Sequence, residues 1–317
     1  MPFDYSVTNL LQSIRDVSNV GPSNQDWPDA KILRLVNREV MEYLVPMIRT
    51  ARNGHFATYQ DVPLVAGQAA YPIPSKAVGM GLRADQLVDA NGIAYGRVTE
   101  DQLEDVINYS GSWSAGPQPQ GTPTRFYFRG NSVVLFPTPS GTPALSLRLY
   151  FDARPSALVL NATCLQVSSF PVGAPGGSYR LGFTGTASTG YTAAVVCDLV
   201  QNVPGFDVLQ TVAISNTGSG YLEFVGTKPS QLAVGDWICL TDSAPVVTGA
   251  IPEIVVGCLI EKVALKVMSG KSDDAAFNRQ ARLLKKDEES ARSFLKRRTT
   301  GDRPKAGAGS LNRFRRG

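Results

Sequence analysis

The stretch GDWICLTDSAPVVTGAIPEIVVGCLIEKVALKVM, from Gly235 to Met268, contains two kinds of structural pattern in succession. Its opening part, DWICL, is typical of a short strand. From Ile251 apolar residues recur three and four positions apart, which predicts an amphipathic helix ended by Gly270. The apolar stripe of this helix consists of Val255, Val256, Leu259, Ile260, Val263 and Val267. The chain therefore combines strands with helices and changes from one to the other near Thr248.

Helical spacing also occupies both ends of the chain. On the C-terminal side, Ser272 can cap a last helix that reaches Arg298, with Phe277, Ala281, Leu284, Ala291 and Leu295 inward. At the N-terminus one helix runs from Val7 to the Gly21-Pro22 stop. A second opens at Asp26, with Pro46 bending it near its end. Its stripe is Ile32, Leu35, Val36, Val40, Tyr43, Leu44 and Met47. Because each apolar face must pack on something, residues 1–54 and 250–298 are predicted to form one helix bundle.

Residues 55–155 have a sequence pattern that is typical of β-strands. The segments FATYQDVPLV, AYPIP and GLRADQLVDANGIAYGRV are extended, and Asn91-Gly92 is a strong hairpin-turn signal. A second hairpin turns at Gly130-Asn131. Thr99–Gln102 forms a capping box that predicts a short helix through about Asn108. This part is predicted to be an antiparallel β-sheet domain.

Residues 156–249 form a third region, rich in Gly, Ser, Thr and Val and poor in charge. Short strands are predicted at LQVSSF, YRLGF, AAVVCDL, VLQTVAI, YLEFVG and DWICL. Six strands with tight turns favour an inserted all-β domain, either a sandwich or a small barrel. The predicted fold class is α+β.

The charge is divided unevenly along the chain. Residues 279–317 carry 13 Lys/Arg and 4 Asp/Glu, a balance of +9, whereas the remaining residues have a balance of −5. The segment 299–317 is too polar to order itself in water, and a terminal block of one sign is typical of an interaction arm. Nucleic acid and protein are both possible anchors for it. Leu311 and Phe314 between arginines favour a groove on a protein partner.

Motifs of catalysis and cofactor binding are missing from the sequence. It has no G-x-x-x-x-G-K-[ST] and no strand-linked G-x-G-x-x-G, and the one histidine, His55, lacks a nucleophile elbow as partner. The four cysteines are far apart and are expected to be reduced, buried thiols: Cys164, Cys197, Cys239 and Cys258. No secretion signal or long apolar run is recognisable. We expect a soluble protein without enzymatic activity, metal or cofactor.

The order of these parts resembles the head-to-tail adaptor proteins (connector or tail tubular proteins) of tailed bacteriophages. The resemblance rests on WPDAKILRLVNREVMEYL, AYPIP, TPTRFYFRGNSVVLFPTPSGTPALSLRLYFDARPSAL and the stretch Gly235–Met268, with IPE opening a helix after the GDWI strand. These cover nearly all of the chain outside the interior of residues 156–235. One departure is EIVVG after IPE, where the family often has an acidic stretch of the EELHP type.

The resemblance implies a virion neck or tail protein that is assembled in the host cytoplasm and serves genome ejection. Its copies, usually twelve, would form a ring docked on the portal protein and joined to tail nozzle or tail tube proteins. Double-stranded DNA would pass through without sequence-specific contact, and no membrane would be involved. The arm would fasten the ring to the portal through Arg303, Lys305, Leu311, Arg313, Phe314, Arg315 and Arg316.

The channel wall is expected to be acidic or uncharged, because phosphate binding along it would resist the passage of DNA. Asp101, Glu104 and Asp105 are candidate lining residues; alternatively, they merely solubilise an outer surface. Two other functions remain open: recognition of host-surface carbohydrate or receptor by the all-β insertion, and a cell-wall hydrolase or lyase of the virion.

Overall fold

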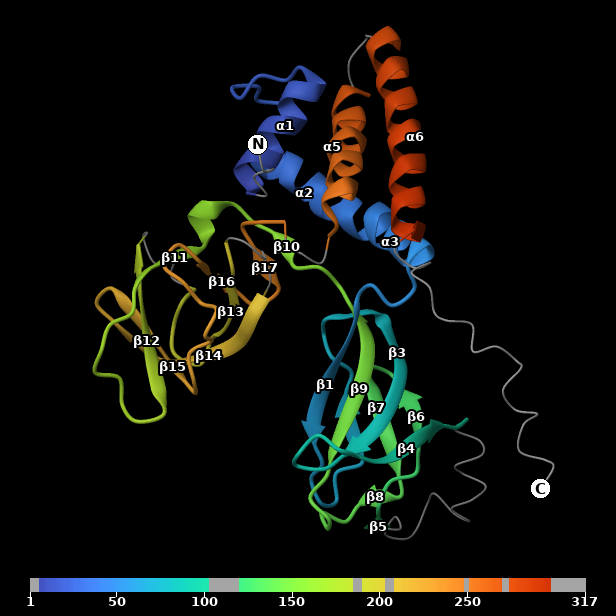
Figure 1. The fold of residues 1–317 in the computed structure, drawn as a ribbon, viewed down its shortest axis with the longest axis vertical. Coiled ribbons are helices and arrows are strands. Elements are labelled where there is room, and N and C mark those ends of the chain that lie inside the picture. The colour runs from blue at the N-terminus through green and yellow to red at the C-terminus, as the bar shows by residue number, and fades with distance from the viewer. Residues whose placement is uncertain are drawn as a thin grey trace, which may run out of the picture. The chain divides into compact units, whose positions relative to one another are not determined.

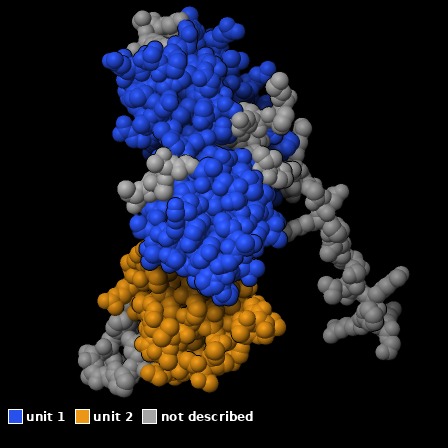
Figure 2. All heavy atoms as spheres, turned by 90° about the vertical axis from the view of Figure 1, so that its left-hand side faces the viewer, with its two compact units in different colours: residues 1–53, 155–317 blue, residues 54–154 orange. Residues whose placement is uncertain are grey.

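The computed structural model shows a mixed fold of helices and strands (Figure 1). By their internal contacts the residues divide into two compact units, shown in different colours in Figure 2. Unit 1 combines residues 1–53 with residues 155–317, and unit 2 is the segment Gly54–Arg154. The structure describes residues 6–102, 120–184, 190–202, 208–247, 251–269 and 274–297.

The first helix of unit 1 has defined caps at both ends. Helix α1 (Val7–Ser18) begins after Ser6, whose hydroxyl accepts a hydrogen bond of 3.3 Å from the backbone N–H of Asn9. It ends at Asn19, which adopts the left-handed conformation with φ 50°. The first predicted helix is therefore confirmed.

The second predicted helix begins later than expected. We expected Asp26 to cap it, but α2 (Asp29–Glu39) has Pro28 at the N-cap position and no side-chain cap. Proline fixes φ and has no N–H to donate, so it fits the edge of a helix.

A π-helical turn joins α2 to the next helix. The turn, Val40–Leu44, leads into α3 (Val45–Ala51), and Pro46 lies in the first turn of α3. Proline has no N–H for an intrahelical bond, and its ring collides with the carbonyl four residues earlier. The wider π turn accommodates this proline at the place where the sequence predicts a bend.

The two C-terminal helices are α5 (Glu253–Met268) and α6 (Asp274–Arg297). Helix α5 contacts α1, α2 and α6, and α6 also contacts α3. Figure 1 shows α5 between α1 and α6. The predicted apolar stripe of α5 is buried throughout. In α2, however, Leu35 is only half-buried, and Leu33 is the buried residue beside Ile32 and Val36.

Unit 2 is built around one seven-stranded sheet in the order β1-β9-β3-β4-β6-β7-β2. Its strands are β1 (Ala57–Pro63), β2 (Ala70–Pro72), β3 (Ala77–Val88), β4 (Ala94–Glu100), β6 (Arg125–Arg129), β7 (Ser132–Phe136) and β9 (Ser146–Ala153). A parallel pair, β5 (Gln120–Gly121) and β8 (Thr138–Pro139), lies outside it. Both predicted hairpins, β3–β4 and β6–β7, are confirmed.

Two expectations for this sheet are wrong. The pair β4–β6 is parallel, so the sheet is not wholly antiparallel. Thr99 and Glu100 do not open a helix but continue β4, where they pair with Arg125 and Phe126. Backbone hydrogen bonding to a neighbouring strand outweighs the local capping preference of these residues. The later part of the predicted helix lies outside the described residues.

The main core of unit 2 lies on one face of the sheet, as the alternation of strand residues predicts, and a smaller cluster around Tyr127 and Val134 lies on the other. Strand β9 shows this alternation clearly, since Leu147, Leu149 and Phe151 are buried and their neighbours Arg148 and Tyr150 are not. The core cluster consists of Tyr71, Ile73, Ala77, Leu87, Val98, Phe126, Val133, Leu135, Leu145, Leu147, Leu149 and Phe151.

The six strands predicted in the insertion are confirmed, and they form a closed barrel rather than a sandwich. They are β11 (Leu165–Ser169), β12 (Ser178–Thr184), β13 (Val196–Val200), β14 (Val208–Gly218), β15 (Tyr221–Val225) and β16 (Trp237–Leu240). All neighbours are antiparallel, in the order β11-β12-β15-β14-β13-β16, and β16 pairs with β11 to close the ring.

Two short segments lead into and out of the barrel. They are β10 (Ala157–Leu158) and β17 (Ser243–Ala244), which pair in parallel. The amide of Asn37 on α2 donates to the carbonyl of Leu158 (2.8 Å) and accepts from its N–H (2.7 Å). The backbone N–H of Val7 donates to the carbonyl of Pro245 (2.9 Å). Strand β10 is thus tied to α2, and the residue that follows β17 is tied to α1.

Candidate partner-binding surfaces

Most of the predicted site residues lie outside the described residues. This applies to the docking arm (Arg303, Lys305, Leu311, Arg313, Phe314, Arg315 and Arg316) and to Glu104 and Asp105 of the predicted channel lining. Their roles stay predictions. Asp101 is the one predicted site residue that the structure describes.

Asp101 follows directly after β4 and is paired with a cation. Its backbone N–H donates to the carbonyl of Phe126 (2.8 Å), and its carboxylate accepts from Nη1 of Arg125 at 2.7 Å. The side chains of Asp101 and Arg125 are 21% and 36% exposed. The charge of Asp101 is therefore offset by Arg125.

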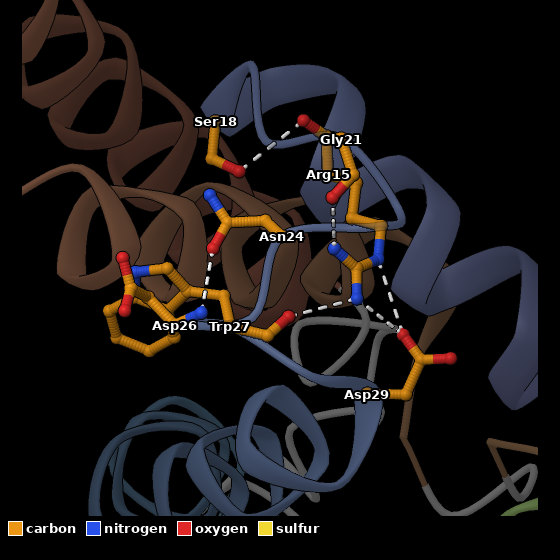
Figure 3. Close-up of polar contacts among 7 residues, drawn as sticks. All are labelled: Arg15, Ser18, Gly21, Asn24, Asp26, Trp27 and Asp29. Atoms are coloured by element: carbon orange, nitrogen blue, oxygen red, sulfur yellow. Dashed lines mark hydrogen bonds and ion pairs between the residues drawn. The ribbon is translucent and has the colours of Figure 1, made fainter.

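Arg15 anchors the loop between α1 and α2 (Figure 3). Its side chain is 4% exposed, and its guanidinium donates to the carbonyls of Gly21 and Trp27, both at 2.9 Å. It also donates to Oδ1 of Asp29, at 2.6 Å from Nη2 and 3.2 Å from Nε. A buried cation is costly unless it is paired and hydrogen-bonded. These four contacts meet that condition and fix the loop that carries Trp27.

Sequence reasoning missed the role of Arg15, although a signal for it was present. Leu11, Arg15 and Ser18 are spaced four and three positions apart, and all three are buried on α1. A charged residue on the apolar stripe of a helix indicates a buried partner. Asp29 lies on the next helix, within reach across the loop.

A pocket with a basic lining lies between α2 and the end of α5. Its volume is about 500 Å³, and it is lined by Trp27, Lys31, Arg34, Leu35, Arg38, Lys266 and Ser269. Nζ of Lys31 lies 4.2 Å from the centroid of the Trp27 ring, a cation–π contact. The spacing of Lys31, Arg34 and Arg38 places them along one side of α2, another pattern that sequence reasoning missed.

Two carboxylates lie close to this basic pocket. Glu39 is 2% exposed; it forms an ion pair with Nζ of Lys266 and lies 3.6 Å from Nε of Arg38. Glu42 is 65% exposed and lies 3.7 Å from the same nitrogen. Four cationic side chains against two carboxylates leave the pocket with a positive charge. Such a surface is complementary to an acidic segment of a partner.

A second pocket, of about 320 Å³, lies where α3 meets the end of α6. It is lined by Glu42, Tyr43, Pro46, Met47, Thr50, Ala51, Arg292 and Lys296. The hydroxyl of Tyr43 donates to Oε1 of Glu288 at 2.6 Å, which joins α6 to the π turn. Burial and this carboxylate raise the pKa of Tyr43 above its ordinary value. The pocket lies next to the end of α6, from which the predicted arm continues.

The side chain of Glu261 on α5 is an acidic group at the contact between α5 and α6. Burial, together with the nearby negative charge of Asp287, raises the pKa of Glu261 to about 7. The carboxylate form of Glu261 is therefore disfavoured in the folded chain. Protonation of this group favours the packing of the two helices.

Histidine and cysteine are two further kinds of reactive side chain in the described part of the chain. His55 stacks edge-on against Phe56 with a centroid distance of 4.9 Å. The four cysteines are free and buried, as predicted. Within the described ranges no three His, Cys, Asp or Glu side chains are grouped so that they could hold a metal ion. None of the described helices is long and apolar enough to span a membrane.

Comparison with known protein families places the N-terminal part of the chain in one of them. A model of the SU10 adaptor protein family matches residues 5–182, which is more than half of the chain. This range contains α1 to α3, the whole of unit 2, the first strand of the barrel and most of the second. No curated protein matches the chain.

Proposed function

Because the chain belongs to the SU10 adaptor protein family, a family of phage head-to-tail adaptors, we propose that it joins the capsid of a tailed phage to its tail. Membership of this family implies a component of the virion. In the proposed assembly, copies form a ring below the portal protein, bind tail proteins on the other side and continue the channel for double-stranded DNA. The observation that carries the proposal is the family match.

The surface of unit 1 supports a role in assembly. The terminal helices are proposed to form one bundle, because α5 contacts both α1 and α2 and also packs against α6. The pocket beside Trp27 is proposed to receive an acidic segment of the portal or of a neighbouring subunit. The chemistry favours this role, since ion pairs around Glu39 hold the basic side chains in place.

The proposed channel wall is acidic or uncharged. The Asp101–Arg125 pair is compatible with this wall, because a neutralised pair binds phosphate weakly. A structure of the assembled ring tests the assignment. We expect acidic or uncharged side chains to outnumber Lys and Arg along the lumen, and stacked rings of arginine there would overturn it.

The experiment that tests the function is co-assembly. The full-length chain is mixed with the portal protein of the same phage and analysed by mass photometry and electron microscopy. We expect a ring, of twelve copies by the resemblance, attached to one end of the portal. A monomer that leaves portal complexes unchanged in mass would refute the proposal.

The basic pocket is tested by Arg34→Glu with Arg49→Glu as matched control, because Arg49 is also exposed but outside the pocket.

A second candidate function rests on the barrel. Its β11–β12 loop exposes apolar side chains: Val172 is 94% exposed and Phe170 is 37% exposed, with Nζ of Lys228 lying 4.5 Å from the Phe170 ring. Exposed apolar groups of this kind are typical of an interaction site. We therefore keep recognition of the host surface as an alternative. Binding of the full-length chain to host cells, lost in Phe170→Ser, would support it.

A further inference from the structure

Two cysteines lie opposite each other at the seam that closes the barrel. Strand β11 pairs with β16 through Leu165↔Ile238 and Gln166↔Trp237. Continued by one residue, the same antiparallel register places Cys164 opposite Cys239. Both thiols are buried in one cluster outside the barrel interior, together with Val200, Ala244 and Val246.

The position of this pair in the ladder brings the two side chains close. The N–H of Val167 donates to the carbonyl of Asp236 at 2.8 Å, so odd-numbered residues of β11 direct their hydrogen bonds towards β16. Cys164 and Cys239 are therefore a pair without mutual backbone hydrogen bonds. Such pairs have Cα atoms about 4.5 Å apart and the closest side chains in an antiparallel ladder. A disulfide needs a Cα separation of about 4.4–6.8 Å.

We propose that Cys164 and Cys239 are an oxidisable dithiol that forms a disulfide across the β11–β16 seam, with a small-molecule disulfide such as oxidised glutathione as the oxidant. In the first step a Cys164 thiolate attacks one sulfur of the oxidant and displaces a glutathione thiolate, which takes up a proton. Cys239 then loses its proton and attacks the Cys164 sulfur, which releases the second glutathione. The cysteines lose two hydrogen atoms and the oxidant gains them.

The surroundings of the two thiols agree with this order of events. The S–H of Cys239 donates to the sulfur of Cys164 and lowers the pKa of Cys164, whereas burial raises the pKa of Cys239. The thiolate is the attacking form of cysteine. Cys164 is also the more exposed of the two, at 7% against 0%. It is therefore the first to react.

The other two cysteines are separate from this pair and serve as matched controls. Cys197 lies on β13, but its side chain belongs to the cluster inside the barrel. Cys258 lies on α5 in contact with α6. Cys197 is the stricter control, because it lies in the same barrel and on the strand next to Cys239.

The disulfide would reinforce a short seam. Only two residue pairs join β11 to β16, whereas five join β12 to β15. A covalent link between the first and last strands of the barrel restricts the unfolded chain over the whole length between them. We expect the oxidised protein to melt at a higher temperature than the reduced protein, and the gain to vanish in Cys239→Ala.

The test uses the full-length chain in buffers of reduced and oxidised glutathione, followed by mass spectrometry and peptide mapping without reduction. We expect a loss of two hydrogen atoms and a Cys164–Cys239 cross-link, unchanged in Cys197→Ala and Cys258→Ala. Cys239→Ala should give no cross-link and can carry glutathione on Cys164. Because the thiols are buried, the same buffers are also used during refolding from urea, where both are accessible. Four free thiols after refolding in excess oxidised glutathione, or a cross-link that involves Cys197 or Cys258, would overturn the proposal.

Discussion

Asp85 introduces a carboxyl group into the core of unit 2 without a hydrogen-bond partner. It is 1% exposed, and neither of its oxygens is bonded within the part of the chain that the structure describes. It lies opposite Val98 on β4 and Leu149 on β9, both of which belong to the apolar core. Burial, together with the smaller effect of the charge of Glu100, raises the pKa of Asp85 from 3.8 to about 7.

This carboxyl group makes stability depend on pH. The unfolded chain releases the proton near pH 4, whereas the folded chain retains it up to about pH 7. The stability that protonated Asp85 allows is therefore fully present below pH 4. As the pH rises to 7, the free energy of unfolding falls by about 4 kcal/mol because the buried group must ionise. In Asp85→Asn the part of this decline that is due to Asp85 should disappear from urea denaturation curves measured between pH 4 and 8, whereas the part that is due to Glu261 should remain. Glu100→Gln should only reduce the part that is due to Asp85. An Asn variant with the parental pH profile would contradict the assignment.

Arg15 gives a second prediction for a single residue. Arg15→Met should lower the free energy of unfolding by about 2–4 kcal/mol, because it leaves the carbonyls of Gly21 and Trp27 without their donor. Arg15→Lys keeps the positive charge but not the planar, forked guanidinium with its several N–H donors. It should therefore recover only part of the lost free energy of unfolding. Asp29→Asn should cost less, since Asp29 is 54% exposed. Denaturation followed by tryptophan fluorescence measures these changes; a Lys variant as stable as the parent would disprove a role for the forked guanidinium.

Single residues were the hardest part to predict from sequence. The helical spacing of Arg15 held information about its burial, but its carbonyl partners come from a loop whose path depends on the folded structure. Asp85 reads in sequence as an exposed strand residue, because its burial results from pairing with β9 and β4. The role of Asp101 in lining the channel stays a prediction, and its neutralisation by Arg125 depends on the parallel β4–β6 pairing, which no local pattern contains.

Among the described elements, α5 is the helix that contacts the most other helices. The packing of its buried face can be tested by truncating one side chain. Leu259 is fully buried, so Leu259→Ala should lower the free energy of unfolding by about 2–5 kcal/mol. Ile254 on the same helix is 38% exposed, and Ile254→Ala should change it by less than about 0.5 kcal/mol. Thermal and urea unfolding give both values. A Leu259→Ala protein as stable as the parent would exclude a packed site.

The barrel supplies the second prediction for an element. Residues 161–241 can be replaced by a short Gly/Ser linker that keeps β10 and β17, and with them the bonds from Asn37 to Leu158. If the barrel is an independent insertion, this variant should fold and still assemble on the portal. Helical circular dichroism separates misfolding from loss of assembly. A folded variant without rings would mean that the barrel provides contacts between subunits.

Most elements could be predicted because their signals are local. Alternating apolar residues between glycine-rich turns were enough to predict all six barrel strands. Their spatial order was not, because the pairing of β12 with β15 or of β13 with β16 joins segments far apart in sequence. The capping box at Thr99 failed for the same reason, since β6 supplies hydrogen bonds that no local pattern contains.

For the whole molecule, the basic arm is the feature that the proposed assembly depends on. Deleting residues 299–317 should leave a folded, soluble protein that no longer joins portal rings. If Leu311 and Phe314 occupy pockets on the partner, added salt should weaken attachment only in part, because screening acts on the charges and not on the apolar contacts. Mass photometry with portal complexes measures both effects. Unchanged binding by the truncated chain would show that other surfaces fasten the ring.

The discontinuous make-up of unit 1 has a consequence for how the protein emerges from the ribosome. Glu39 and Lys266 are 227 positions apart, and Tyr43 and Glu288 are 245 positions apart. At a synthesis rate of roughly 5–20 residues per second, the apolar faces of α1 and α2 wait roughly ten to fifty seconds for α5 and α6. Unit 2 is made entirely within that interval and can fold first. During the wait, the nascent N-terminal helices are natural clients for a chaperone of the host.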